Sequence, residues 1–185
     1  MTHIVRIANL TDAKALSHIA ASTFALACSA GTPRDDIDAY IDSELTQCRF
    51  EDHVASSSKS ILVAEINSRI VGYLMLCYEE APADLIAQRP LELRQIYVLP
   101  EYHGSGVAAD LIACAVHEAI IGGYDSLWLG VSGSNQGLTF YRKHGFSVAG
   151  KYHFPLGNIV YEGVLMSRRM SSDNSLRPKP LHGSA

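Results

Sequence analysis

A short apolar strand, a glycine loop and a helix follow one another in this chain, and this succession most constrains its fold. The strand pattern covers 91–98, the loop reads Pro-Glu-Tyr-His-Gly-Ser-Gly-Val-Ala over 100–108, and helical spacing continues to Ile121. A glycine loop at the start of a helix exposes backbone N–H groups at the positive end of the helix dipole. We therefore expect an anion site here, and a phosphate-bearing cofactor is the first hypothesis.

Composition excludes several classes of partner. The 185 residues include 19 acidic and 15 basic side chains, a formal net charge of −4, so we expect neither nucleic acid nor a membrane surface as partner. The four cysteines are far apart, as in a reducing compartment, and no histidine or cysteine pattern predicts a metal site. We find no secretion signal and no membrane-length apolar run, so a cytoplasmic monomer or homodimer is expected.

Apolar periodicity predicts a mixed α/β layer structure. We expect strands over 3–8, 60–65, 70–78, 91–98, 126–131, 146–151 and 158–167, and helices over 12–27, 34–48, 107–121 and 134–144. Thr11 or Asp12 is the expected cap of the first helix, and Asn67-Ser68 is the expected hairpin turn. Residues 1–170 are expected to form one domain, and 171–185 a disordered tail because they are polar and aperiodic.

The glycine loop also fits a dinucleotide-binding pattern. Gly104 to Ala109 satisfies G-x-G-x-x-G/A, and Asp125 follows about twenty residues later. In a dinucleotide fold, however, the acidic residue ends the next strand, whereas Asp125 precedes it. A hairpin also comes before the loop where βαβ units would be needed. Both a dinucleotide site and a purely structural turn therefore remain open for this loop.

Two motifs together resemble the GNAT superfamily of N-acetyltransferases, which depend on acetyl-coenzyme A (acetyl-CoA). One is the loop over 103–108, where His103 stands in place of the family's Gln or Arg. The other is Asn135 followed by Phe-Tyr-Arg-Lys-His-Gly-Phe over 140–146, with Leu138 in place of the usual Ala. The resemblance covers roughly 5–170. It implies an α+β fold with a mixed, mostly antiparallel sheet of six or seven strands, about four helices, and a V-shaped splay between the strands over 91–98 and 126–131.

The resemblance also implies which residues hold acetyl-CoA. The strand over 91–98 would offer backbone groups to the pantetheine arm and the thioester oxygen, and the glycine loop would hold the pyrophosphate. For Arg142, a phosphate contact and a solvated helix face both remain open. The implied cofactor-binding residues are Ile96, Tyr97, Val98, His103, Gly104, Ser105, Gly106, Val107, Ala108, Asn135, Tyr141 and Arg142.

Acetyl transfer to an amine needs a base for the ammonium proton and an acid for the departing thiolate. Tyr141 occupies the family position of that acid, although a core aromatic role is the alternative. Strict alternation places Glu92, Arg94, Ile96 and Val98 on one strand face, and Glu92 lies where histone-type members have their catalytic glutamate. Arg94 could instead hold Glu92 in a structural ion pair and make it a poorer base. Both roles of Glu92 stay open.

The acceptor is predicted from charge and from a narrower resemblance. Acidic residues gather in the segments expected to line the acceptor side, and they suit a polyamine or other small cationic amine, although a solvated helix face would look the same. They are Asp35, Asp36, Asp38, Asp42, Glu44, Glu79, Glu80 and Asp84. The segments 91–98, 128–131 and 152–157 resemble the PaiA branch of spermidine/spermine acetyltransferases, but Asn158 replaces its usual acid.

We expect direct attack of a primary amine on acetyl-CoA in a ternary complex. Cys114 sits in a helical pattern without a local base, so an acyl-cysteine route is not expected. Two alternatives remain, acetylation of a protein N-terminus or lysine, and a non-catalytic acyl-CoA-binding module.

Overall fold

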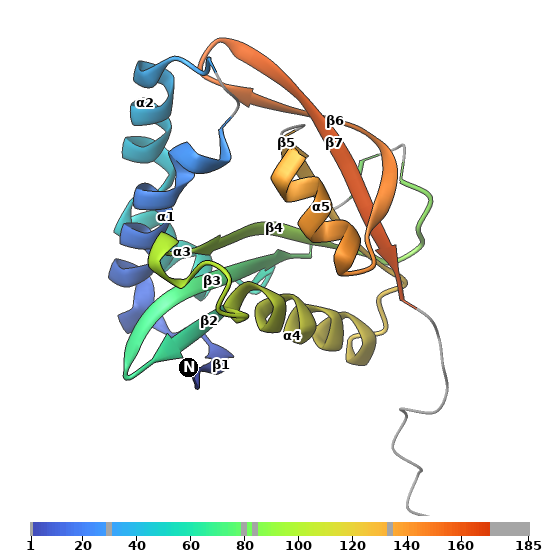
Figure 1. Cartoon of the computed structure of the whole chain (residues 1–185), viewed down its shortest axis with the longest axis horizontal. Coiled ribbons are helices and arrows are strands. Elements are labelled where there is room, and N and C mark those ends of the chain that lie inside the picture. The colour runs from blue at the N-terminus through green and yellow to red at the C-terminus, as the bar shows by residue number, and fades with distance from the viewer. Residues whose placement is uncertain (1, 29–30, 79–80, 83–84, 133–134, 171–185) are drawn as a thin grey trace, which may run out of the picture.

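The computed structural model describes residues 2–28, 31–78, 81–82, 85–132 and 135–170 (Figure 1). The tail expected over 171–185 lies outside them. The strands are β1 Ile4–Ile7, β2 Lys59–Ile66, β3 Arg69–Cys77, β4 Pro90–Val98, β5 Ser126–Ser132, β6 Ser147–Leu156 and β7 Ile159–Arg169. The helices are α1 Ala13–Ala27, α2 Arg34–Glu44, α3 Gln47–Ala55, α4 Val107–Ile121 and α5 Asn135–Lys143, with 3-10 turns η1 Leu10–Asp12 and η2 Pro100–Tyr102. No helix in the described part of the chain is both long and apolar enough to cross a membrane.

One seven-stranded sheet carries the fold, in the order β1-β2-β3-β4-β5-β7-β6. Every neighbouring pair is antiparallel except β4 and β5. These two parallel strands pair only from Pro90 to Glu92, opposite Ser126 to Trp128, and β4 then continues to Val98 without β5. The mostly antiparallel sheet and its V-shaped splay are therefore confirmed.

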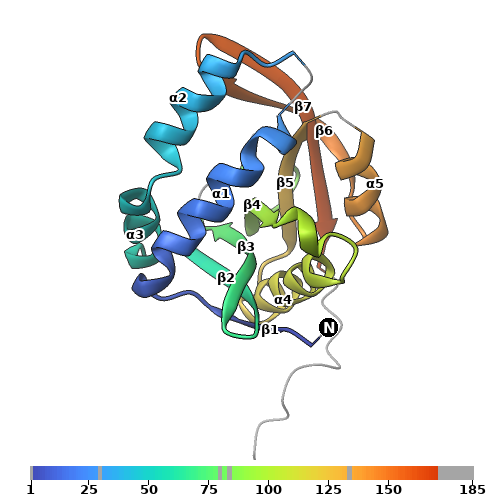
Figure 2. The ribbon, with the colours of Figure 1, turned by 60° about the vertical axis from the view of Figure 1, so that its left-hand side comes forward.

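Helices cover both faces of the sheet and bury a separate apolar cluster on each. On one face, α4 packs Leu111 and Ala115 against β2, β3 and β4, and α5 packs partly buried side chains onto the same cluster. On the other face, α1 and α3 pack Leu16, Ile19 and Phe50 against β2 and β3 (Figure 2). The open end of the splay lies between these two layers.

The structure corrects two expectations about the N-terminal helices. The helix expected over 34–48 is broken at Leu45, because Thr46 takes an extended conformation and its side chain accepts the Arg49 N–H at 3.3 Å, which starts α3. For the first helix, Asp12 does stand at the N-cap position of α1, but its side chain makes no capping hydrogen bond there. Asn9 instead caps η1, which runs into α1, and the Asp12 carboxylate accepts hydrogen bonds from Arg6 and from the Asn9 N–H. Five α-helices therefore stand where about four were expected.

A β-bulge in β4 corrects the alternation expected for this strand. Gln95 pairs with Met75 and Leu93 with Leu76, so Arg94 is an extra residue without an opposite number on β3. Beyond the bulge the side chains change faces, and Glu92 does not share a face with Ile96 and Val98. The physical reason is the extra residue, which breaks the period of two.

Pairing with β3 shows where Glu92 points. Its opposite residue is Cys77, while Tyr97 stands opposite Tyr73, and both of these β3 residues belong to the cluster under α1 and α3. Glu92 and Tyr97 therefore face the α1 side of the sheet, whereas Ile96 and Val98 face α4.

Candidate active site

The site begins where β4 leaves β5. The N–H of Leu99 donates to the carbonyl of Val71 on β3 at 2.9 Å, and backbone groups of successive strand residues point to opposite neighbours. The backbone groups of Val98 and Ile96 therefore point away from β3, toward the side that β5 has vacated. The N–H groups of Ile96 and Val98 face the side where β5 has ended.

The glycine loop follows directly and ends at the start of α4. Gly104 has φ +76° and Gly106 has φ +93°, values that favour glycine, and no atom lies within 4 Å of a Cβ built on either residue. The Ser105 hydroxyl donates to the Tyr102 carbonyl at 2.6 Å and fixes the loop. The first N–H groups of α4 lack partners within the helix, and Val107 anchors that end in the core. The arrangement is an open anion cradle at a helix N-terminus.

His103 lies at the junction of strand and loop. Its Nε2 is 2.9 Å from the Val98 carbonyl oxygen, so this ring nitrogen donates when it carries the proton. The contact turns the ring toward the end of β4. A pyrophosphate contact through His103 stays a prediction.

Tyr141 lies on α5 with its ring against Phe140 and Phe146, at centroid distances of 5.4 and 5.8 Å. Burial raises the pKa of the Tyr141 hydroxyl well above its ordinary value. The pKa of Tyr97 is also raised, chiefly by burial and to a lesser extent by Tyr40, Cys28 and Tyr141. The Tyr97 and Tyr141 hydroxyls thus lie close enough to interact electrostatically across the splay, and both stay protonated at neutral pH.

Glu92 and Arg94 form the charged group of the site. Arg94 Nε donates to Glu92 Oε2 at 3.0 Å, with the glutamate side chain 4% exposed and the arginine side chain 43% exposed. The pKa of Tyr152 is raised by burial first and then by the charge of Glu92, which places its hydroxyl near the pair. Tyr40 is likewise within the electrostatic reach of Arg94.

The sequence did not identify the aromatic residues around the Glu92–Arg94 pair as part of the site. Tyr152 of β6 lies across Gly130 of β5, where a Cβ would collide with its ring. Trp128 stands opposite Glu92 in the sheet, 6.2 Å from the Tyr152 ring, and its buried Nε1 has no hydrogen-bond partner among the described residues. A glycine inside a buried strand, two residues after Trp128, was the available signal.

Comparison with known proteins identifies the family. Residues 57–148 match the family described as "Acetyltransferase (GNAT) domain". An uncharacterized N-acetyltransferase of Mycobacterium tuberculosis is 38% identical over 162 residues, which is 87% of this chain and 99% of that protein. The chain belongs to the GNAT family. It is accordingly an acetyl-CoA-dependent N-acetyltransferase.

Solved structures share this GNAT fold. The PaiA N-acetyltransferase from Thermoplasma acidophilum, in complex with coenzyme A, superposes with a TM-score of 0.74 at 20% identity, over 91% of this chain and 99% of that one. The ribosomal-protein-alanine N-acetyltransferase from Brucella melitensis gives a TM-score of 0.64 at 20% identity, over 90% and 99%. Only the second of these descriptions names an acceptor, and at 20% identity the shared fold does not select one for this chain.

Two of the five acidic residues of α2 form ion pairs in this GNAT protein. Asp38 pairs with Arg34 at 2.9 Å, and Glu44 pairs with Arg49 at 3.1 Å. Asp35 and Asp42 are exposed, whereas Asp36 is half-buried. Glu79, Glu80 and Asp84 lie outside the described residues. The inward side of α2 carries Ile37 and Tyr40, whose ring stacks on Phe24 of α1.

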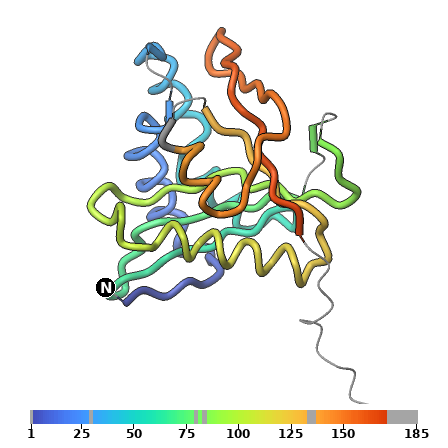
Figure 3. The backbone as a smooth tube through the Cα atoms, turned by 45° about the vertical axis from the view of Figure 1, so that its right-hand side comes forward, coloured from blue at the N-terminus to red at the C-terminus, as the bar shows by residue number. Residues whose placement is uncertain are grey.

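The β6–β7 hairpin contacts α2 at its tip. It rises from the sheet and reaches α2 with its tip (Figures 1 and 3). At the turn, Gly157 has φ +57° and a Cβ on it would collide with the Asp36 carboxylate. The hairpin tip and α2 are therefore in close contact, above β4 and beside α1.

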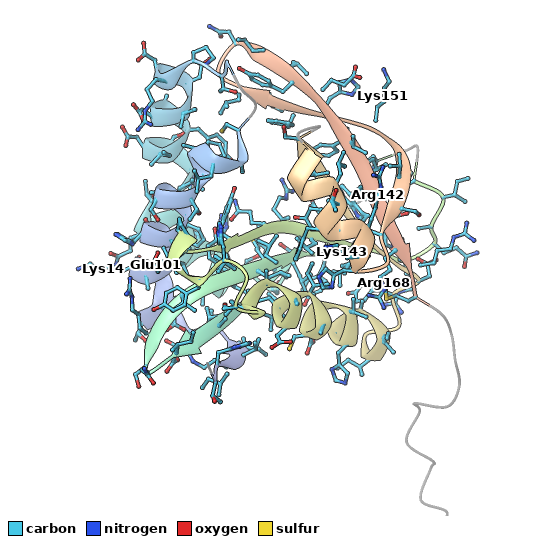
Figure 4. The ribbon with its side chains drawn as sticks, in the orientation of Figure 1. Lys14, Glu101, Arg142, Lys143, Lys151 and Arg168 are labelled. Carbon is cyan, nitrogen blue, oxygen red and sulfur yellow. The ribbon has the colours of Figure 1, made fainter. Side chains whose placement is uncertain are left out.

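The remaining predicted cofactor residues lie on α5. Arg142 is exposed on this helix, beside Lys143 (Figure 4). Asn135 is the first residue of α5, and its side chain lies outside the described part of the structure. Among the described residues, no group of His, Cys, Asp and Glu could hold a metal ion.

Proposed function

We propose that this protein transfers the acetyl group of acetyl-CoA to a primary amine by direct attack in a ternary complex. The main observation in support of this proposal is the splay between β4 and β5. It leaves the backbone N–H groups of Ile96 and Val98 facing away from β3 where β5 has ended, on the strand that leads into the open glycine loop before α4. A pantetheine arm with its pyrophosphate fits this combination of free strand donors and helix N-terminus.

Tyr141 supplies the acid of the reaction in this proposal. Its raised pKa keeps the hydroxyl protonated, and its electrostatic interaction with Tyr97 of β4 supports a position beside the splay. As the tetrahedral intermediate collapses, the C–S bond breaks and the phenolic proton passes to the departing sulfur. The backbone N–H of Val98 stabilises the oxyanion.

Glu92 supplies the base, directly or through a water molecule. It takes a proton from the acceptor ammonium so that the neutral amine can attack the thioester carbon. Its position on the α1 face of β4, under the hairpin and near Tyr152, puts it on the acceptor side. Arg94 keeps the carboxylate ionised and oriented at 3.0 Å.

The loop residues His103 to Ala108 and the α5 residues Asn135 and Arg142 complete the cofactor site. The backbone N–H groups of Gly106, Val107 and Ala108 face the pyrophosphate at the start of α4. Arg142 meets a phosphate of the nucleotide part, and Asn135 contacts the arm.

A polyamine or another small cationic amine is the acceptor that we favour. Tyr40 and Tyr152 lie within electrostatic range of Arg94 and Glu92, aromatic rings attract an ammonium, and Glu92 can receive its proton. The contact between the hairpin tip and α2 roofs this half of the site. Such a cover favours a slender amine over the lysine of a folded protein.

The free state of all four cysteines supports a reducing compartment, and we place the protein in the cytoplasm as a monomer or homodimer. Size-exclusion chromatography with light scattering measures the assembly.

An amine panel with detection of released thiol tests the proposed function. We expect turnover with spermidine, spermine or other small amines, and mass spectrometry should show one added acetyl group per amine. Cofactor binding without turnover of any amine would indicate that the protein is a non-catalytic acyl-CoA-binding module. Turnover only of peptides with a free N-terminus or a lysine would replace the small acceptor by a protein.

A further inference from the structure

A second cavity lies outside the acetyl-transfer site. It has a volume of about 600 Å³ and opens between the start of α1, the β2–β3 turn and the residue that follows β4. The lining residues that matter are Arg6, Asp12, Lys14, His18, Arg69 and Leu99. Its volume falls within the range of small-molecule sites, roughly 300–1,000 Å³. None of these residues belongs to the cofactor loop, to α5 or to the Glu92–Arg94 pair.

Cationic side chains outnumber acidic ones in the lining of this cavity, in a protein of net charge −4. Arg6, Lys14 and Arg69 are cationic and Asp12 is the acidic member of the lining, while Glu65 and Glu101 just outside it pair with Arg6 and Arg69. Lys14 and His18 stand one turn apart on α1, and both are exposed. Local charge of this sign concentrates anions.

The cations come from separate elements and are held in different ways. Arg6 on β1 is fixed, because it binds Asp12 at 2.7 Å and Glu65 at 3.0 Å. Lys14 has no ion pair among the described residues. Arg69 reaches Glu101 of η2 at 3.4 Å, and both of these side chains are more than half exposed. Arg69 therefore has a weak partner that a ligand can displace.

We propose that this cavity binds a small molecule with at least two negative charges, such as a phosphate ester or a polycarboxylate. Lys14 and Arg69, which come from α1 and from the start of β3, bind the anionic groups. The site is distinct from the pyrophosphate cradle. Figure 4 shows Lys14 and Glu101 on one side of the molecule and Arg142 and Lys143 of α5 on the other.

Glu101 competes with the ligand for Arg69 in this site. Replacing Glu101 by Gln removes the competing charge and should tighten anion binding, an effect that damage to the fold would not produce. Replacing Lys14 and Arg69 by Gln should have the opposite effect. The two sets of variants should therefore change the affinity for the anion in opposite directions.

Isothermal titration calorimetry tests the proposal with inorganic pyrophosphate and with citrate as probes. The protein is first saturated with CoA, so that the cradle at Gly104–Ala108 is occupied, and the salt concentration is near physiological. We expect saturable binding of at least one probe, weakened about tenfold or more in K14Q/R69Q and tightened in E101Q. Binding of pyrophosphate alone identifies a phosphate ligand, and binding of both probes identifies recognition of charge.

The matched control is R34Q/R49Q, which loses the same charge from exposed, ion-paired arginines of α2 and α3. It should bind the probes as the wild type does. Absence of saturable binding, or equal weakening in the control pair, overturns the proposal. Thermal denaturation of each variant verifies that the fold is retained. Loss of acetyl transfer in the amine panel would not affect this result, because the titration needs no turnover.

Discussion

At the scale of single residues, the hydroxyl of Tyr141 can be separated from its ring. Tyr141→Phe keeps the packing on Phe140 and Phe146 and removes the proton donor. We expect kcat to fall about 100- to 10,000-fold, with KM for acetyl-CoA and the melting temperature unchanged. Steady-state kinetics with thiol detection measures this. Tyr124→Phe, whose ring stacks on Tyr78 away from the open end of the splay, is the control, and equal rates in both variants would exclude an acid role for Tyr141.

Glu92 requires a different measurement, because the loss of a catalytic base and the loss of an ion-pair partner would both lower the activity. The base must be ionised to act, so activity should rise with pH as the carboxylate loses its proton. Glu92→Gln removes this acidic limb and should lower kcat/KM about 100-fold or more. The measurement is the pH profile of kcat/KM with a small amine. A retained acidic limb, together with a lowered melting temperature, would assign Glu92 to the ion pair with Arg94.

Asp12 affects stability, with a defined dependence on pH. Hydrogen bonds from Arg6 hold the pKa of Asp12 below its ordinary value, against the opposing effect of burial. Because the folded pKa is the lower one, the stabilisation is present above the unfolded pKa of about 3.9 and is lost as pH falls through the folded value. Asp12→Asn should lower the free energy of unfolding by about 1–3 kcal/mol at neutral pH.

Urea unfolding across pH measures the effect of Asp12→Asn, and the difference from the wild type should shrink in acid. The exposed Asp38, paired with Arg34, gives the control Asp38→Asn, with an expected change of about 0.5 kcal/mol or less. A loss for Asp12→Asn that stays constant from neutral to acid pH would contradict the ionic contribution.

At the scale of elements, local signals in the sequence predicted the parts of the fold that local chemistry determines. The Asn67-Ser68 turn has positive φ at both residues, as such hairpins require, and the loop at Gly104 and Gly106 precedes a helix as expected. The bulge at Arg94 was not predictable, because an extra residue shows only in the pairing with β3. The end of α2 at Leu45 was missed for a similar reason, since apolar spacing continued through it.

The same distinction applies to the site. The sequence marked Tyr141 and the loop through motifs, whereas Trp128, Tyr152 and Tyr40 come together only when β5, β6 and α2 are placed in space. The face of Glu92 also depends on the bulge. Residues that act through tertiary contacts therefore carried no pattern of their own.

Disturbing the contact between the β6–β7 hairpin and α2 should change KM for the amine and leave KM for acetyl-CoA unchanged. Gly157→Ala places a Cβ against the Asp36 carboxylate and moves the hairpin tip away from α2. We expect KM for the amine to rise about tenfold, with KM for acetyl-CoA unchanged, and steady-state kinetics with each substrate varied measures both. Adding Asp36→Ala removes the collision and should restore KM, although the strain of alanine at φ +57° remains. A KM that the second substitution leaves unchanged would contradict the role of this contact.

At the scale of the whole molecule, the splay divides the sheet into two parts. β1 to β4 and β5 to β7 are joined in the sheet by three paired positions of β4 and β5. A cofactor lying in the splay contacts both parts, with β4 and the α4 cradle on one side and α5 on the other. Its binding should therefore stabilise the molecule as a unit and should not merely order one loop.

CoA binding should raise the melting temperature through this bridging contact. At a concentration of about 100 times Kd, a ligand of the folded state adds about 2.7 kcal/mol, which corresponds to a shift of roughly 5–10 °C for a chain of this size. Differential scanning calorimetry measures the shift, and hydrogen exchange should slow at Ile96 and Val98 as well as along α5. Pantetheine lacks the diphosphate and should stabilise less at equal concentration. In Gly106→Val, a β-branched residue would have to adopt φ +93°, so the cradle is distorted and the shift should fall to that of pantetheine. Equal shifts from CoA and pantetheine would show that the cradle contributes nothing, and protection confined to β4 would show that the cofactor does not bridge the two parts.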